Sequence, residues 1–531
     1  MKKLLALLLA MICIGGTMPI FASAATGDDG TTNWDFIVPV THQTIVPNGY
    51  IGIYNIQQLN AIQDNPSGNY ILMNNIDLGS VKDWKPIGGT YFSGIFDGNG
   101  YTISNMKIGS LTVTTSVYFQ TGLFYHISGS GTVKNLGVVA SAINISSAGI
   151  AGYVRIGMIA GRSSGVIENC FNKGSINCSI GEYLKYSYTD IGGIVGEGGM
   201  VRNCYNTGAI STNLGLTCYV GGITGGGEVE NSFNTGNITV KGESKYDNDF
   251  KVFAGGVAGF GKIKGSYNTG KVEANSNKSA YAGGVAGGSS SVINTYNTAP
   301  VIVSGSEGVY GGGLAGRADQ LRNSYNAGDI TATTSKNAYI GGVVGELNDQ
   351  FSSANIQLTT CFNTGNVTGT AGSFAYIGGI AGTSNGPISQ AYNAGTLTAT
   401  AQTTFAYIGG ILGEGSVSTL SDDFFLNQIT NAVGNDSTAT TNAKALSKSE
   451  MQDASNYNNF DFTNTWTIEA SKNSGFPYLK NLPLAEKSNG NTGDNSGNNT
   501  PKKKIFGTKY DSNFWNWIKF VVLFGWIWMW F

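Results

Sequence analysis

The sequence predicts an all-β protein whose central part is a parallel, right-handed β-solenoid (β-helix) of about ten coils with short helical capping segments. Three observations predict this fold. Glycine makes up 78 of the 531 residues, two short motifs repeat every 28 to 37 residues, and aliphatic residues form fixed columns within the repeats. The region shows no helical 3.6-residue apolar period, and glycine is costly inside helices.

The first repeated motif is an aromatic residue followed by asparagine. An aliphatic residue stands four positions before each aromatic residue, and another stands five positions after it. Glycine stands three positions after the aromatic residue in all copies but one. The eight copies begin at Phe171, Tyr205, Phe233, Tyr267, Tyr296, Tyr325, Phe362 and Tyr392. Because asparagine and glycine tolerate positive φ, we expect these Asn-x-Gly segments to form the corners between short strands.

The second motif lies about ten residues upstream of each asparagine and consists of two glycines, an aliphatic residue, a small residue and a closing glycine. The nine copies end at Gly161, Gly196, Gly225, Gly259, Gly287, Gly316, Gly345, Gly382 and Gly413. A single unit cannot bury its apolar face alone. Stacking units about 4.8 Å apart would give every strand a partner above and below and would enclose the aliphatic columns.

The segments outside the repeats have distinct compositions. Residues 1–24 are typical of a secretory signal peptide, with Lys2 and Lys3 before an apolar stretch and Ala22-Ser23-Ala24 at its end. We expect helical caps over Asn55–Gln63 and Ser447–Asn456. The predicted organisation after the signal peptide is a lead-in (25–47), a capping segment with the first coils (48–120), the repeat solenoid (121–430), a C-terminal cap (431–482), a flexible linker (483–510) and a hydrophobic tail (511–531).

The C-terminal tail predicts an anchor in the membrane or cell envelope. Five tryptophans fall within the last seventeen residues, and twelve uninterrupted apolar residues run from Phe520 to Phe531. Tryptophan prefers the bilayer interface, which favours anchoring over the alternative that the tail docks on the solenoid. With the signal peptide, the tail predicts an exported protein.

The net charge and the cysteines argue against nucleic-acid binding, a disulfide framework and a zinc site. The net charge of −2 excludes the basic surface that nucleic acid requires. Five cysteines remain after signal cleavage, with neither a disulfide framework nor a zinc pattern. Cys170 and Cys204 occupy a position that accepts only small residues, so they are either two buried thiols, which we favour, or a disulfide between adjacent coils.

Together the two motifs resemble the GLUG repeat family of bacterial cell-surface proteins, as in Gly192-Gly193-Ile194-Val195-Gly196. The flanking segments Phe96–Ile103 and Gly475–Leu479 are similar to the lead-in and closing segments of such proteins, and the resemblance covers residues 48–482. It implies display at the bacterial cell surface. Related repeats occur beside IgA-cleaving metalloproteases, but this sequence has no HExxH motif.

The sequence predicts no enzyme: we identify no catalytic, cofactor-binding or metal-ligating residues, and we expect no cofactor. The only histidines, His42 and His126, lie in different regions. A GxSxG match at Gly161–Gly165 lacks the strand-turn-helix context of a nucleophile elbow. Glu197, Glu346 and Glu414 share one position in the repeat, and we expect them to be separate charges on a solvated face.

The best binding candidate is an aromatic column two residues before the glycine pair. Its members are Tyr219, Phe253, Tyr281, Tyr310, Tyr339, Tyr376 and Tyr407. Arg155 and Asp190 hold this position in earlier coils. If exposed, the column would be a stripe on which sugar rings stack. Alternation from the aliphatic position four residues later instead predicts an inward, stacked core, unless a glycine bulge reverses the parity.

These features favour an exported cell-surface solenoid with a structural or adhesive role. The expected partners are the membrane or cell envelope, through the tail, and a glycan or a surface protein of a host or neighbouring cell; we expect no nucleic acid. The alternative is a polysaccharide lyase or hydrolase on the same scaffold. Ice binding, through Thr331-Ala332-Thr333 and Thr398-Ala399-Thr400, is least favoured.

Overall fold

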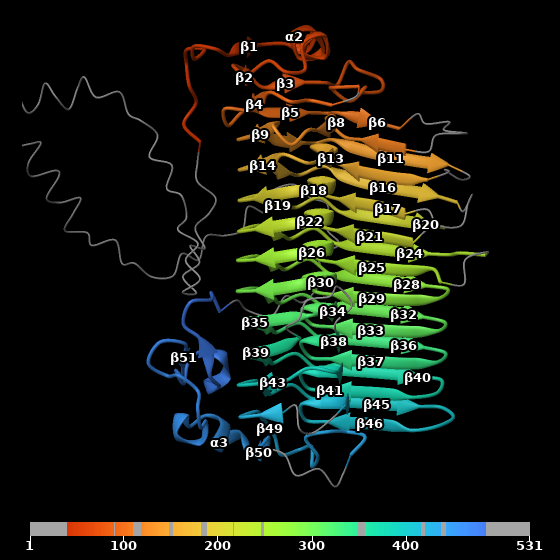
Figure 1. Ribbon diagram of the computed structural model, residues 1–531, viewed down its shortest axis with the longest axis vertical. Helices are drawn as coiled ribbons and strands as arrows, with labels where there is room; N and C mark the ends of the chain where they lie inside the picture. The colour runs from red at the N-terminus through yellow and green to blue at the C-terminus, as the bar shows by residue number, and fades with distance from the viewer. Residues whose placement is uncertain are drawn as a thin grey trace, which may run out of the picture. The chain divides into compact units, whose positions relative to one another are not determined.

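The computed structural model describes residues 40–89, 91–109, 118–147, 152–181, 188–215, 217–245, 249–348, 356–415, 420–436 and 442–484. Over this part of the chain the backbone winds into a parallel β-solenoid of about ten coils, as predicted (Figure 1). The signal peptide and the hydrophobic tail lie outside the described residues, as does the linker from residue 485 onward.

Three parallel sheets form the faces of the solenoid. Sheets B and C each contain one strand from each of ten successive coils. Sheet B contains β6 (Lys107–Ile108), β11 (Ala142–Ser147), β16 (Ser175–Ile180), β20 (Ile210–Leu214), β24 (Ile238–Gly242), β28 (Val272–Ser276), β32 (Val301–Gly305), β36 (Ile330–Thr334), β40 (Val367–Ala371) and β45 (Leu397–Ala401). Sheet C contains β7 (Tyr118–Thr121), β12 (Tyr153–Gly157), β17 (Tyr188–Gly192), β21 (Thr217–Gly221), β25 (Lys251–Gly255), β29 (Ser279–Gly283), β33 (Gly308–Gly312), β37 (Asn337–Gly341), β41 (Ala375–Gly378) and β46 (Ala406–Gly409).

Sheet A is the third face, and in most coils it receives two or three short strands on either side of a bend. Its strands are β1 (Ile51–Ile53), β2 (Tyr70–Leu72), β3 (Ile76–Asp77), β4 (Ile95–Asp97), β5 (Thr102–Ser104), β8 (Phe124–Ile127), β9 (Thr132–Lys134), β10 (Gly137–Val139), β13 (Ala160–Ser163), β14 (Val166–Glu168), β15 (Phe171–Asn172), β18 (Val195–Arg202), β19 (Tyr205–Asn206), β22 (Thr224–Glu230), β23 (Phe233–Asn234), β26 (Ala258–Lys264), β27 (Tyr267–Asn268), β30 (Ala286–Ile293), β31 (Tyr296–Asn297), β34 (Ala315–Ala318), β35 (Gln320–Asn326), β38 (Val344–Leu347), β39 (Gln357–Asn363), β42 (Ala381–Ser384), β43 (Ile388–Ser389), β44 (Tyr392–Asn393), β47 (Leu412–Gly415), β48 (Leu420–Ser421), β49 (Phe424–Leu426) and β50 (Lys444–Leu446).

The Asn-x-Gly segments form the corner between sheets A and B as predicted, for example between β15 and β16, but not through positive φ. Positive φ occurs instead at a bend within sheet A that was not predicted. The left-handed residue of each bend stands two positions before the aromatic residue, at Asn169, Asn203, Asn231, Gly265, Asn294, Asn323, Thr360, Gln390 and Asp422. The five asparagines among them have φ between +46° and +54°. The asparagine that follows the aromatic residue is not at a left-handed corner, because it lies in a short strand and points into the solenoid.

These inward asparagines form a buried amide ladder, which we call the asparagine ladder. Its members are Asn172, Asn206, Asn234, Asn268, Asn297, Asn326, Asn363 and Asn393. In each coil but the last, Nδ2 donates to Oδ1 of the next asparagine at 2.8–2.9 Å. Each side chain also bonds the backbone N–H and C=O two residues later, as Asn268 does with Gly270. The Asn-x-Gly pattern therefore satisfies the buried backbone polar groups of this turn.

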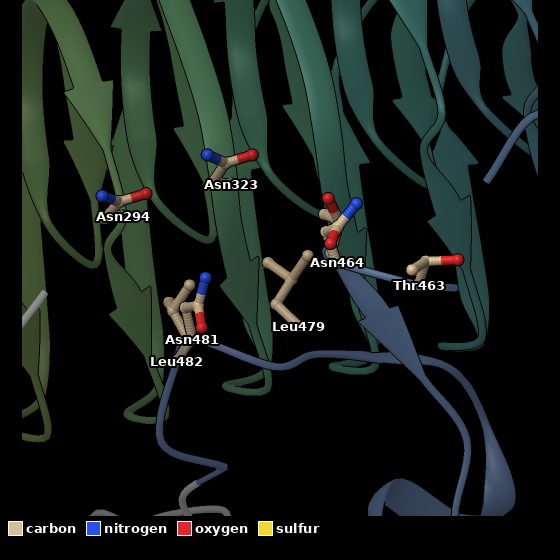
Figure 2. Close-up of a pocket in the computed structure, with 8 residues that line it drawn as sticks. Asn294, Asn323, Thr463, Asn464, Leu479, Asn481 and Leu482 are labelled. Atoms are coloured by element: carbon tan, nitrogen blue, oxygen red, sulfur yellow. The ribbon is translucent and has the colours of Figure 1, made fainter. Parts of the chain in front are cut away.

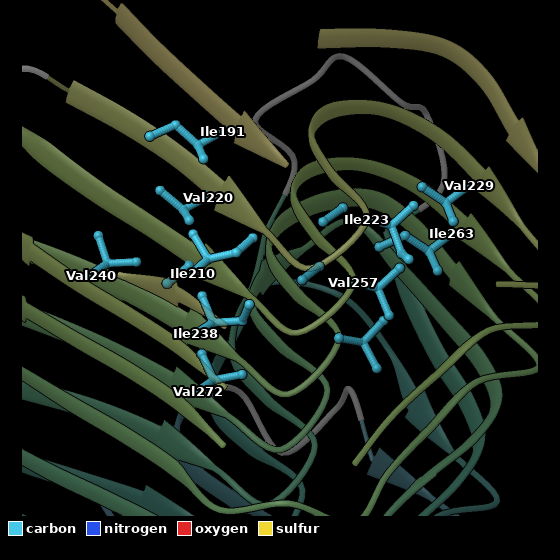
Figure 3. Packing of buried hydrophobic residues seen from close by; sticks show 14 of the residues in the cluster. Ile191, Ile210, Val220, Ile223, Val229, Ile238, Val240, Val257, Ile263 and Val272 are labelled. Carbon is cyan, nitrogen blue, oxygen red and sulfur yellow. The ribbon is translucent and has the colours of Figure 1, made fainter. Parts of the chain in front are cut away.

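The aliphatic columns of the repeat form the hydrophobic core. Figure 3 shows how Ile210, Ile238 and Val272 of sheet B stack and face Ile191 and Val220 of sheet C. Ile223 and Val257 add a column at the glycine corner, and Val229 and Ile263 add one from sheet A. All of these side chains are at most 1% exposed.

The second glycine of each pair allows two coils to approach closely at the corner between sheets C and A. A Cβ atom on Gly284 would lie 2.2 Å from Cγ of Asn297 and 2.3 Å from the carbonyl oxygen of Gly313. Contacts that short are sterically excluded, so this coil needs glycine at position 284. In the first copy Met158 occupies the corresponding position, so the requirement belongs to the later coils.

The predicted helical caps are present as short helices. The first consists of α2 (Ile56–Asn60), with Asn55 as N-cap, and η1 (Ala61–Asp64). The second consists of α3 (Lys448–Met451), which begins with a capping box between Ser447 and Glu450, and η3 (Ala454–Asn456).

The C-terminal segment does more than close the end of the solenoid. Its remaining elements are β51 (Trp466–Thr467), η4 (Asn473–Gly475) and β52 (Tyr478–Leu479), with β51 antiparallel to β52. The aromatic residues beside the asparagine ladder point outward and stack between coils; they form the sheet A ladder, from Phe171 to Tyr392. Trp466 and its neighbours pack against the later rings of this ladder, so the segment lies along one face (Figure 1).

All five cysteines of the described chain are buried, free thiols. The backbone N–H of Cys170 points to Sγ of Cys204 at 3.4 Å, so the two occupy neighbouring coils as expected. In the next coil Ser232 Oγ takes the corresponding place and accepts a hydrogen bond from the Cys204 N–H at 3.0 Å. The favoured prediction of two reduced thiols agrees with this structure.

Candidate functional site

The aromatic column before the glycine pair points outward, so the prediction that it forms the core is wrong. In β21, Cys218 and Val220 are fully buried while Tyr219 between them is partly exposed. Phe253, Tyr281 and Tyr376 point to the same side but are only 4–9% exposed, so the column lies outside the interior core while part of it is buried. The glycine pair ends each sheet C strand and turns the chain into sheet A. Side chains alternate between inward and outward only within one strand. The aliphatic residue beyond the glycine pair belongs to the next strand, so it does not predict which way the aromatic column points.

The outward column forms a continuous stack of rings. From Tyr219 to Tyr407, neighbouring ring centroids are 4.4–5.3 Å apart with interplanar angles of 2–17°. Three further rings extend the stack and were missed in the sequence: Tyr118, Tyr153 and Tyr188, at centroid distances of 5.4, 6.0 and 6.5 Å. They stand two positions earlier in their strands, which keeps the same outward parity. We call these ten rings the sheet C ladder.

A second column faces the sheet C ladder across the glycine corner. It consists of the residue after each closing glycine, and register pairs its members from coil to coil. They are Arg162, Glu197, Gly226, Phe260, Gly288, Arg317, Glu346, Thr383 and Glu414. We call this the facing column, and the ladder and facing column together the corner surface.

Contacts across the corner show that its two sides are close. The rings of Tyr219 and Phe260 meet edge to face at 5.9 Å. The Arg317 guanidinium lies 5.2 Å from the ring centre of Tyr281 and 5.9 Å from that of Tyr310. Arg317 Nε also donates to Glu346 Oε2 at 2.7 Å. Glu346 is therefore a buried, paired carboxylate, and the expectation of a separate charge on a solvated face is wrong for it.

The first coils carry a charged cluster instead of ladder rings at the column position. Arg155 pairs with both Asp190 and Glu197, and Arg162 Nε lies 3.2 Å from Glu197 Oε2. Burial, and the charge of Glu197, raise the pKa of Asp190 from 3.8 to about 7, although Arg155 and Arg162 oppose the shift. Burial and the same arginines lower the pKa of the neighbouring His126. Near neutral pH the Asp190 carboxyl group is therefore partly protonated.

Five phenol groups of the ladder, those of Tyr219, Tyr281, Tyr310, Tyr339 and Tyr376, have raised pKa values and stay neutral over the physiological range. Burial, reinforced by neighbouring negative charge, raises the pKa of Tyr219 and of Tyr376 to about 12. A neutral phenol can both donate and accept a hydrogen bond. Because the rings stack face to face, their faces cover one another, and a ligand would meet ring edges and hydroxyl groups. The predicted stripe therefore exposes ring edges, and sugar rings cannot stack on the ring faces.

One further pocket, of about 380 Å³, lies where the C-terminal segment meets the bends of sheet A (Figure 2). Four amide side chains and two threonines line it with two leucines: Asn294, Asn323, Thr463, Asn464, Thr465, Leu479, Asn481 and Leu482. It lies at the bends of sheet A and shares no lining residue with the corner surface.

The described part of the chain contains neither a metal-binding cluster nor a membrane-spanning helix. No group of three or more histidine, cysteine, aspartate or glutamate side chains there is placed to hold a metal ion. None of the helices in that part is long and apolar enough to span a bilayer.

Comparison with known proteins gives limited matches. No family model matches the sequence. A stretch of 178 residues is 30% identical to halomucin of Haloquadratum walsbyi and spans 29% of this chain but only 2% of halomucin. Two solved structures align: a candidate immunoglobulin A1 protease from Bacteroides ovatus (15% identity, 81% of this chain and 92% of the other, TM-score 0.27) and an IgA1 protease (16%, 64% and 21%, TM-score 0.25). Such TM-scores carry no argument about function, and the GLUG-type resemblance stays a prediction.

Proposed function

We propose that this protein is an exported, surface-displayed solenoid that binds glycans along its corner surface. The observation that carries the proposal is the arrangement of that surface. A row of neutral phenol edges faces a column of arginine, glutamate and threonine side chains across one corner, repeated coil after coil. Sugars present ring hydroxyl groups that both donate and accept, and such mixed polar and aromatic surfaces match them.

Glycan binding is tested with the full-length protein on an array of neutral and acidic oligosaccharides. Wild-type protein should bind a subset of the array, and the double variant Tyr339→Ala plus Tyr376→Ala should lose that signal. Tyr205→Ala, which removes a half-exposed ring of the sheet A ladder, is the matched control and should keep it. Absence of any wild-type signal, or equal losses for both ladders, would contradict the proposal.

Display is proposed to depend on residues 1–24 for export and on residues 511–531 for attachment to the membrane or envelope. The supporting features are the composition of the two segments and the linker that separates the tail from the solenoid. Fractionation of bacterial cells that express the full chain, compared with a chain ending at Lys487, is the test. The full chain should be recovered with membranes and the shortened chain should be released. Equal release of both would contradict anchoring by the tail.

A second candidate function, hydrolysis of a polysaccharide, is favoured by the charged cluster alone. Asp190, with a pKa of about 7, would be a proton donor beside the second carboxyl group, that of Glu197, and a pair of carboxyl groups is what glycoside hydrolysis requires. Release of reducing ends from a polysaccharide by wild-type protein, and its loss in Asp190→Asn, would support this function. No release from any polymer that the protein binds would leave the binding function as the better account.

A further inference from the structure

We propose that the corner surface takes one class of ligand: an extended, unbranched, neutral polysaccharide with β-1,4-type linkages, bound parallel to the solenoid axis with one sugar unit per coil. This inference rests on the proposed glycan-binding function and specifies its ligand. The binding site is the run of five consecutive ladder tyrosines with the facing residues beside them. The five are Tyr281, Tyr310, Tyr339, Tyr376 and Tyr407.

The repeat distance of the ladder is the first argument. Successive centroids in this run are 4.4, 5.1, 5.2 and 5.3 Å apart. They follow the spacing of neighbouring strands, about 4.8 Å, and an extended β-1,4-linked pyranose chain advances by nearly the same length per unit. A chain laid along the axis would therefore meet the same set of groups at every unit. An α-1,4-linked chain coils and cannot keep this register.

The second argument is that every coil of this run supplies a polar group on both sides of the corner. The closing glycines fix the pairing, because a Cβ on Gly345 would lie 2.9 Å from the carbonyl carbon of Tyr310, and one on Gly382 would lie 2.6 Å from that of Tyr339. The residue after each glycine thus lies beside the tyrosine of the preceding coil. Glu346 follows Gly345, and Arg317, Thr383 and Glu414 take the same place in their coils.

Ring stacking decides how a sugar can use these groups. Interplanar angles of 2–12° in this run leave ring edges rather than ring faces at the surface, so recognition must occur through hydrogen bonds rather than by stacking on a ring face. Tyr281 is only 4% exposed because Arg317 covers it, so a unit at that coil would meet Arg317. Each unit over the later rings would bond one phenol and the facing side chain beside it. Hydrogen bonds of this kind favour regular hydroxyl patterns, and a branch would collide with one side of the corner.

Charge on the facing column selects a neutral chain. Arg317 is already paired with Glu346, and Glu414 has no hydrogen bond or ion pair in the described structure. Burial raises the pKa of Glu414 above its ordinary value, as expected for a half-buried carboxylate without a cation. The run therefore presents unpaired acceptor capacity and no unpaired cation, which attracts hydroxyl groups and repels uronic-acid chains.

The experiment measures binding of the full-length protein to defined oligosaccharides by calorimetry. Cello-oligosaccharides of increasing length are the probe series, with maltohexaose as the α-linked control and hexagalacturonate as the acidic control. Affinity should rise with each added unit up to about five or six units and then level off. Tyr310→Phe and Tyr339→Phe keep the ring stack but remove one hydroxyl each, and each should weaken binding about two- to tenfold. Tyr205→Phe on the sheet A ladder should leave binding unchanged.

The outcomes distinguish glycan binding itself from the assignment of a neutral, β-linked chain with one sugar unit per coil. If the protein binds cellobiose as tightly as cellohexaose, or maltohexaose as tightly as cellohexaose, the one-unit-per-coil register is wrong while glycan binding stands. Preference for hexagalacturonate would overturn the neutral-chain assignment. If Tyr310→Phe and Tyr339→Phe bind like wild type while the ladder alanine variants do not, hydroxyl recognition is wrong. Failure to bind any glycan overturns both the inference and the proposed function.

Discussion

Replacement of Asn268 by alanine tests the asparagine ladder at its centre. Its Nδ2 donates to Gly270 O at 2.7 Å and to Asn297 Oδ1 at 2.9 Å, and its Oδ1 accepts from Gly270 N at 3.1 Å and from Asn234 Nδ2 at 2.9 Å. The side chain is fully buried. Asn268→Ala removes all four bonds and leaves the buried groups of Gly270 without this partner. At about 1–3 kcal/mol for each of these two unsatisfied buried groups, the expected loss is about 2–6 kcal/mol.

Asn393, at the end of the asparagine ladder, provides a control with a smaller expected loss of stability. Asn393, the last member, makes three of these bonds, because no further ladder asparagine accepts from it. Asn393→Ala should therefore cost about 1 kcal/mol less than Asn268→Ala. Asn177, exposed on sheet B and bonded only to Asn144 at 2.9 Å, is the surface control, and Asn177→Ala should change stability by less than about 0.5 kcal/mol.

Urea unfolding followed by far-UV circular dichroism measures the free energies of unfolding for these variants. Hydrogen exchange with mass spectrometry locates the effect, since in a solenoid each coil depends chiefly on its neighbours. Amides of the coils on either side of Asn268 should lose protection first. If Asn268→Ala costs no more than Asn177→Ala, the ladder does not stabilise the fold and this reasoning is refuted.

Three further outcomes follow from other contacts. Between about pH 4 and pH 7 the unfolded Asp190 is ionised while the folded carboxyl keeps its proton, so stability should fall as pH rises through this window, and Asp190→Asn should flatten the fall in pH-dependent urea unfolding. Gly284→Ala should destabilise by about 3 kcal/mol or more, whereas Gly308→Ala, whose Cβ would meet nothing nearer than 3.7 Å, should be close to neutral in thermal unfolding. Cys204→Ser offers an oxygen to the Cys170 N–H and should leave the free energy of unfolding unchanged or raise it by up to about 1 kcal/mol; a loss above 2 kcal/mol would show that sulfur packing dominates.

Much of the fold was predictable because its determinants are local and repeated. The aliphatic positions around each aromatic-asparagine pair recur without exception, and the coil length follows directly from their spacing. The helical caps were found from the spacing of Leu59 and its neighbours and from the segment that begins at Ser447. The corner at Asn-x-Gly was placed correctly, but positive φ was assigned to the wrong residue, because asparagine occurs at both the left-handed bend and the inward ladder, and composition cannot separate the two roles.

The candidate site was only half predictable. The seven aromatic residues that share a position were identified, but Tyr118, Tyr153 and Tyr188 were missed because the charged cluster takes their column position. The pairing of Arg317 with Glu346 depends on residues 29 positions apart in adjacent coils. No rule of local periodicity links two such positions until the coil register is known.

The repeat pattern alone predicts that the chain coils, how long each coil is and which aliphatic columns form its core, because a period repeated along the chain needs only stacking to become a solenoid. Only the tertiary structure decided which way the aromatic column faces, since side-chain alternation ends at the glycine pair and starts again in the next sheet. It also decided that the rings cover one another's faces, and that the C-terminal segment lies along the sheet A ladder. Both depend on distances between coils, which no single repeat contains.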